Sequence, residues 1–249
     1  MQFEVLPLLE IMLDFYQKPR NRGRFEDYLR LLYNKDKNQL LLPLPLFNPM
    51  AKDHVIDKLG ALKQLDLENL MGQAVQEVNT ELKRLKLPPQ SIRFAFSLAD
   101  DLRGGWTNRY STDYGNTFQA KGLLNRKFWT CIFWTSEHYD QQLLQHRIRQ
   151  NLWRCVYQIQ HHFPNTLFEH LAQEAFVQSK IPGAVWEGDS ARYALVLDFI
   201  KTHRENTDLP KLITFFYGDV AAESLGYAPL GIPKNTGFQL AERLWKAAR

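Results

Sequence analysis

Residues 91–98 of this chain read SIRFAFSL, and residues 128–135 read FWTCIFWT. In the first stretch, Ile, Phe, Phe and Leu alternate with Arg, Ala and Ser, a pattern typical of a half-buried strand. The second stretch is aromatic, β-branched and apolar on both faces, which predicts a central strand. Together the two stretches predict a small sheet in the middle of the chain.

Helical patterns surround these strands. Before them, the spacing of apolar residues predicts helices over residues 5–17, 24–33, 49–63 and 66–86. After them, it predicts helices over residues 136–163, 167–178, 190–204, 210–225 and 236–248. The sequence therefore predicts an α+β fold that is mostly helical, with two to four mid-chain strands flanked by N- and C-terminal helices.

Local signals mark several helix starts. Asn48-Pro49 predicts one, because Asn is a good N-cap and Pro suits the first turn. Thr166 with Glu169, and Thr236 with Gln239, have the spacing of capping boxes. Residues 5–17 are apolar nearly all round, which predicts a helix buried in the core or in a subunit interface.

Composition excludes several classes of protein. The chain of 249 residues is 45% hydrophobic, has 31 Lys and Arg against 27 Asp and Glu, and holds only two cysteines. It is therefore neither a disordered chain nor a disulfide-built miniprotein. No stretch approaches the about 20 apolar residues that span a bilayer, and the first residues lack a secretory-signal pattern. We expect a single globular domain over residues 1–249, a cytoplasmic location and no membrane partner.

The strongest functional candidate is the stretch of residues 100–118, DDLRGGWTNRYSTDYGNTF, which follows the first predicted strand. Its glycines allow close approach of the backbone to a ligand, and loops at strand ends commonly carry function. The candidate catalytic residues are Asp100 and Asp101, as a general base or a metal ligand. The candidate substrate-binding residues are Arg103, Trp106, Asn108, Arg109, Tyr110 and Asp113. The alternative is a surface loop in which Asp and Arg side chains pair with each other.

Other candidates carry weaker signals. His162, His170 and Glu174 are candidate zinc ligands, but no defined metal-binding spacing appears, so neither a metal nor a cofactor is predicted. Residues 18–24 hold four cations but few aromatic side chains, which is typical of a solvated linker. We therefore expect no sequence-specific binding of nucleic acid.

These observations favour an enzyme or small-ligand-binding protein that acts on an anionic organic metabolite through residues 100–118. The competing class is a non-enzymatic interaction protein, with homo-oligomerisation through the first helix. The two differ in shape, because an enzyme should have a concave pocket and an interaction module a flat patch of aromatic and Arg anchors.

Overall fold

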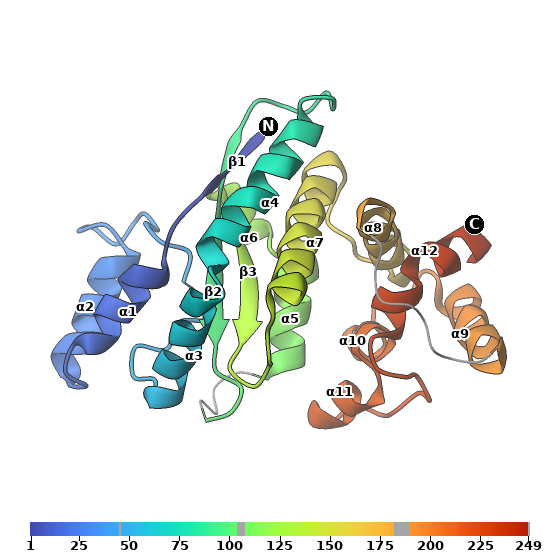
Figure 1. Cartoon of the computed structure of the whole chain (residues 1–249). Coiled ribbons are helices and arrows are strands. Elements are labelled where there is room, and N and C mark those ends of the chain that lie inside the picture. The colour runs from blue at the N-terminus through green and yellow to red at the C-terminus, as the bar shows by residue number, and fades with distance from the viewer. Residues whose placement is uncertain (45, 104–107, 182–189, 249) are drawn as a thin grey trace. The chain divides into compact units, whose positions relative to one another are not determined.

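The computed structural model describes residues 1–44, 46–103, 108–181 and 190–248 (Figure 1). Contacts between Cα atoms divide the chain into two compact units. The first unit comprises residues 1–107 and 120–152, and the second comprises residues 108–119 and 153–249. The single domain expected from the sequence stays a prediction, and each unit is described by itself below.

The first unit is built on a parallel sheet of three strands in the order β1-β2-β3, and the fold is α+β as predicted. The strands are β1 (Gln2–Val5), β2 (Ser91–Ala99) and β3 (Phe128–Trp134). Phe3 is in register with Ile92, and Phe94 with Trp129. The prediction that residues 128–135 form the central strand is wrong. All of β3 is buried, but β2 lies between the other two strands.

The strand β1 ends at Val5, the first residue of the predicted helix over residues 5–17. The helix α1 begins later, at Leu9, and ends at Gln17. The Asn79 side chain binds the backbone of Phe3 on both sides, because its Oδ1 accepts from the Phe3 N–H at 2.8 Å and its Nδ2 donates to the Phe3 carbonyl at 2.9 Å. The Glu68 carboxylate then accepts the N–H groups of Leu8 and Leu9, at 2.6 and 2.9 Å. Two side chains of one helix thus hold both β1 and the start of α1.

The remaining helices of the first unit are α2 (Arg22–Leu32), α3 (Asp53–Gln64), α4 (Leu67–Leu82), α6 (Lys121–Asn125) and the first turns of α7 (Gln141–Gln160). Asn79 and Glu68 belong to α4, which lies along the sheet beside β1 (Figure 1). The helix start predicted at Asn48-Pro49 is wrong. The Asn48 side chain instead closes a turn by accepting the Met50 N–H at 2.9 Å, and α3 begins at Asp53.

The helix α1 buries one apolar face inside the first unit, while Ile11 is exposed. The burial predicted from its sequence is therefore confirmed for that face. Leu9, Met12, Phe15 and Tyr16 are buried. Arg24 of α2 is buried with them, since its guanidinium lies 5.3 Å from the ring centroids of both Phe15 and Tyr16 and donates to the Tyr16 carbonyl. One cation of the 18–24 stretch is therefore a core residue.

The second unit is helical in its described part. It contains α5 (Arg109–Phe118), the end of α7, α8 (Leu167–Lys180), α9 (Ser190–His203), α10 (Leu209–Tyr217), α11 (Asp219–Ser224) and α12 (Thr236–Ala248). The capping box of Thr166 and Glu169 is confirmed. The one expected at Thr236 is wrong, because the Thr236 hydroxyl donates to the Pro233 carbonyl. The helix predicted over residues 210–225 is divided at Gly218, whose φ of 89° favours glycine.

The core of the second unit contains a buried ion pair and two buried side-chain amides. Arg154 of α7 and Glu174 of α8 form a two-point pair, with the Arg154 Nε 2.9 Å and Nη2 2.7 Å from the two carboxylate oxygens. The amides of Gln158 and Gln173 both donate to the Thr117 carbonyl of α5, at 2.8 and 3.1 Å. The buried network therefore ties three helices together.

His170 belongs to the same buried core. Its Nδ1 lies 2.7 Å from the Thr166 carbonyl, which only accepts, so Nδ1 carries the proton. Its Nε2 then accepts from the Tyr114 hydroxyl at 2.8 Å. Burial lowers the pKa of His170 to about 4, although the hydrogen bond to Thr166 opposes this shift.

In the described ranges, no helix combines the length and apolar character needed to cross a bilayer. The longest helix of the chain, α7, carries polar and charged side chains along its length.

Candidate functional site

The carboxyl ends of β2 and β3 place four polar residues together. Because the two strands are parallel and adjacent, both end at the same edge of the sheet. Asp100 and Asp101 follow β2, and Thr135 and Ser136 follow β3. This carboxyl edge is where parallel sheets ordinarily place their ligands.

Asp100 is held in place through one of its two carboxylate oxygens. Its Oδ1 lies 2.9 Å from the His54 Nε2 and 3.0 Å from the Thr135 Oγ1. The same oxygen accepts the backbone N–H groups of Leu102 and Arg103, at 3.1 and 3.2 Å. Burial opposes ionisation, but these bonds outweigh it and hold the pKa of Asp100 below its ordinary value. The ionised Asp100 is therefore suited to orienting a partner rather than to taking up a proton.

Asp101 joins the ends of the two strands. Its Oδ1 accepts the Ser136 N–H at 3.0 Å, and its Oδ2 accepts the Ser136 hydroxyl at 2.6 Å. The Thr135 hydroxyl also lies 3.1 Å from Asp101 Oδ1, so both aspartates contact one hydroxyl group. These contacts fix the shape of the carboxyl edge.

His54 brings the first turn of α3 to this edge. Since the ionised Asp100 only accepts, the His54 Nε2 carries a proton and donates it to Asp100 Oδ1. The other nitrogen, Nδ1, is buried and has no hydrogen-bond partner among the described residues. A buried polar atom without a partner is uncommon, and Nδ1 is therefore a candidate contact for a ligand.

A second polar cluster follows β3 and consists of Glu137, Tyr139 and Arg147. Glu137 forms a two-point pair with Arg147 of α7, and the Tyr139 hydroxyl contacts Glu137 Oε2 at 2.5 Å. The Tyr139 hydroxyl also accepts the Trp134 N–H at 2.7 Å, at the end of β3. Despite desolvation, the pairing with Glu137 raises the pKa of Arg147. This polar cluster holds the segment that follows β3 in place.

The predicted site residues belong to both units. Asp100, Asp101 and Arg103 lie in the first unit, where the Arg103 side chain is exposed. Trp106 lies outside the described residues. The stretch of residues 100–118 is not a loop throughout, because α5 forms within it. The prediction that residues 100–118 form one substrate site is not tested and stays a prediction.

The other predicted residues belong to α5 in the second unit. Asn108 caps this helix, since its Oδ1 accepts the N–H groups of Tyr110 and Ser111 at 2.9 and 3.2 Å. The Arg109 Nε lies 3.8 Å from the Asp113 Oδ2 one turn later. The Tyr110 ring packs edge-on to Tyr217 with the centroids 6.0 Å apart. These contacts give Asn108 and Tyr110 structural roles within the second unit.

The three candidate zinc ligands are engaged elsewhere. His162 pairs with Glu169 at 2.9 Å, Glu174 pairs with Arg154, and His170 bonds Tyr114 and Thr166. In the described ranges, no three His, Cys, Asp or Glu side chains are placed to share a metal ion.

His54, Thr135 and Ser136 are the residues that sequence reasoning missed. His54 is separated from Asp100 by 46 positions, so only the fold reveals the pair. Thr135 and Ser136 had a usable signal, because the residues after two parallel strands meet at one edge. That signal requires knowing that the strands run parallel.

Comparison with known proteins finds no matching family, no matching curated protein and no matching solved structure. What the carboxyl edge does must therefore follow from its own geometry.

Proposed function

We propose that this chain is an enzyme or small-ligand-binding protein that takes an anionic organic metabolite at the carboxyl edge of its sheet. The observation that carries the proposal is the pair formed by Asp100 and His54. One carboxylate oxygen is fixed by four donors, and the paired imidazole keeps a buried nitrogen without a partner in the described structure.

The pair suits proton transfer. When Nδ1 of His54 carries no proton, its lone pair can take one from a ligand O–H or C–H group that reaches it, while Asp100 fixes the ring orientation. When the proton moves to Nδ1, the ring becomes positively charged, and the ionised Asp100 stabilises that charge through Nε2. In this scheme His54 is the general base and Asp100 a positioning residue.

Recognition of an anion falls to Arg103. Its backbone N–H binds Asp100, so its position beside the pair is fixed, and its side chain is exposed without an ion pair in the described structure. A guanidinium group binds carboxylates and phosphates through two parallel hydrogen bonds. An organic acid or phosphate ester with a transferable proton has both an anionic group for Arg103 and a proton for His54.

The proposal is tested with a panel of organic carboxylates and phosphate esters added to the labelled full chain and followed by amide NMR. At least one compound should shift the signals of His54 and residues 100–103 in a saturable way. R103Q should weaken its binding about tenfold, the loss expected for one charge-assisted hydrogen bond. The matched control R84Q removes another exposed arginine of the first unit and should leave binding unchanged.

His54 separates catalysis from binding. If a bound compound is turned over, H54Q should lower kcat with little change in KM, because the base acts in the transition state. A panel that leaves His54 and residues 100–103 unshifted, or equal binding by R103Q and R84Q, contradicts the proposal.

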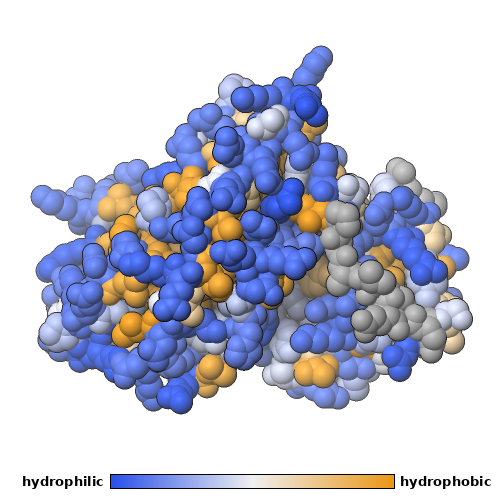
Figure 2. Space-filling view, in the orientation of Figure 1, coloured by the Kyte–Doolittle hydropathy of each residue, from blue (hydrophilic) through white to orange (hydrophobic). Residues whose placement is uncertain are grey.

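A second candidate function is the non-enzymatic interaction module, supported by exposed apolar side chains near the N-terminus. Phe25, Met50, Leu41 and Ile11 are between 36% and 49% exposed. Figure 2 shows apolar patches among the hydrophilic side chains around α1 to α3. Homo-oligomerisation through these residues predicts a mass that rises with concentration in light scattering and falls in F25S. A monomer at every concentration contradicts it.

A further inference from the structure

The excess positive charge of this chain lies in one short stretch. Residues 18–37 hold seven Lys or Arg against three Asp or Glu, an excess of four, and the whole chain has the same excess of four. The remaining residues are thus balanced in charge. This stretch comprises α2 and the turns on either side of it.

The first half of the stretch uses three of its four cations internally. Lys18 pairs with Asp27 at 2.8 Å, Arg20 pairs with Asp53, and Arg24 is buried beneath two aromatic rings. In the second half, Arg30 pairs with Asp27 at 3.2 Å. Lys35 and Lys37 are exposed and form no ion pair with any described residue. Two uncompensated charges therefore lie at the end of α2, and the exposed Arg22 lies at its start.

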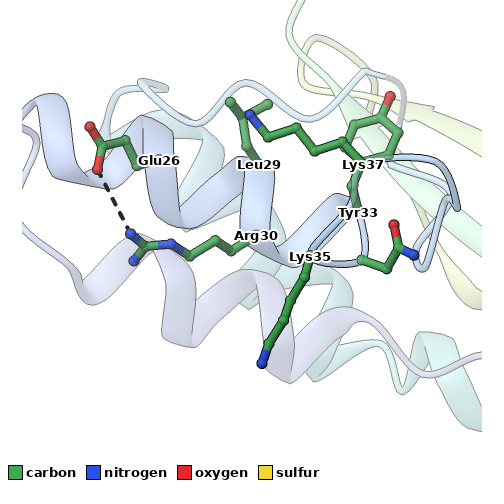
Figure 3. A pocket seen from close by; sticks show the side chains of 7 residues that line it. Glu26, Leu29, Arg30, Tyr33, Lys35 and Lys37 are labelled. Carbon is green, nitrogen blue, oxygen red and sulfur yellow. Dashed lines mark ion pairs between the residues drawn. The ribbon is translucent and has the colours of Figure 1, made fainter.

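A cavity of about 550 Å³ lies at this place, within the about 300–1,000 Å³ typical of small-ligand sites. We call it the α2 pocket, and the residues that line it are Glu26, Leu29, Arg30, Tyr33, Asn34, Lys35 and Lys37. Leu29 and Tyr33 are half-buried and form an apolar wall. Figure 3 shows Arg30 engaged with Glu26, Lys37 extended toward Leu29, and Lys35 on the opposite side.

The turn that carries the two lysines is fixed. The Asn34 Oδ1 accepts the N–H groups of Asn38 and Gln39, both at 3.1 Å. Tyr33 and Leu40 form an antiparallel bridge across the turn. Lys37 has a φ of 54°, in the left-handed region that non-glycine residues rarely adopt. The position of Lys37 is thus set by the turn and not by a flexible end of the helix.

We propose that the α2 pocket binds a phosphate monoester of an aromatic compound. Three cations against one carboxylate leave two positive charges, which match the charge of a phosphate monoester near pH 7. Leu29 and the Tyr33 ring offer an apolar surface for the aromatic group. The pocket contains none of the carboxyl-edge residues, so it is a second site, independent of the proposed function.

The test uses 1-naphthyl phosphate with the labelled full chain at low ionic strength, followed by amide NMR. We expect saturable shifts in residues 29–38 and at least tenfold weaker binding by K35Q/K37Q. The matched control K83Q/K86Q removes two exposed lysines after α4 and should bind as the wild type does. Binding should weaken with added salt, because exposed charges are screened. The shifts should persist in R103Q, which separates this pocket from the carboxyl edge.

Two comparison compounds identify what is recognised. Both 1-naphthol and inorganic phosphate should bind more weakly than the ester, because the first lacks the phosphate group and the second lacks the aromatic ring. Equal affinity for 1-naphthol would show an apolar patch alone, and equal affinity for inorganic phosphate would show a plain anion site. Either result, or the absence of saturation below about 10 mM, overturns the proposal. So does equal binding by K35Q/K37Q, once its amide spectrum shows that it is folded.

Discussion

The ion pair between Arg154 and Glu174 should dominate the stability of the second unit. The Arg154 side chain is 10% exposed and that of Glu174 is 3% exposed, so neither charge reaches bulk water. E174Q removes the carboxylate and leaves the guanidinium buried. Breaking a buried pair on one side costs about 3–5 kcal/mol, because the remaining charge stays desolvated. We expect a loss of this size in the free energy of unfolding.

The assay is urea unfolding of the full chain, followed by amide NMR signals from α8 and α12. Following those signals reports on the second unit alone, even if the two units unfold separately. The matched control is E205Q, because Glu205 pairs with Arg204 at 3.4 Å while 78% exposed. An exposed pair contributes about 0–1 kcal/mol, so E205Q should unfold close to the wild type.

A double variant completes the experiment. R154M/E174L replaces both charges by apolar side chains and should recover most of the stability lost in E174Q. The reasoning is refuted if E174Q changes the free energy of unfolding by less than about 0.5 kcal/mol. It is also refuted if the double variant is as unstable as E174Q, since packing would then explain the loss.

Three further predictions concern other buried groups. The pKa of His170 is lowered to about 4, so between about pH 6.5 and 4 the unfolded state binds more protons than the folded one. As the pH falls through this range, His170 should therefore lower the free energy of unfolding by up to about 3 kcal/mol. The unfolding midpoint of the wild type should accordingly drop more between pH 7 and pH 4 than that of H170Q. N79A should cost about 1–3 kcal/mol in urea unfolding, because it removes both bonds to Phe3; an unchanged midpoint contradicts this. R24M should unfold no earlier than the wild type on heating, because two guanidinium nitrogens of Arg24 are buried without partners in the described structure; a midpoint lower by several degrees contradicts it.

Local patterns were sufficient for β2, β3 and α8. Alternation marked the strand over residues 91–98, and a two-sided apolar run marked the strand over residues 128–135. The Thr166 capping box depends on residues three apart, so it was visible in sequence. Such features are decided within a few residues of one another.

Features decided by distant contacts were missed. The strand β1 has four residues and pairs with Ser91–Phe94. Because its partner is distant in sequence, no local pattern predicts this strand. The following apolar residues suggested a longer helix instead. The pairing of His54 with Asp100 likewise needs the fold, as does the assignment of β2 as the middle strand. Within the site, the aspartates were predicted from composition, but the residues that fix them were not.

The helix α5 precedes β3 in the chain, yet its core partners lie in the second unit. During synthesis, Phe118 leaves the ribosome long before Leu244, which belongs to the same apolar core. At about 5–20 residues per second, the interval lasts roughly 6–25 s. During it, β3 emerges first, and the helices that complete the core around α5 follow one after another. The order of the gene thus makes the packing of α5 wait for helices that are synthesised after β3.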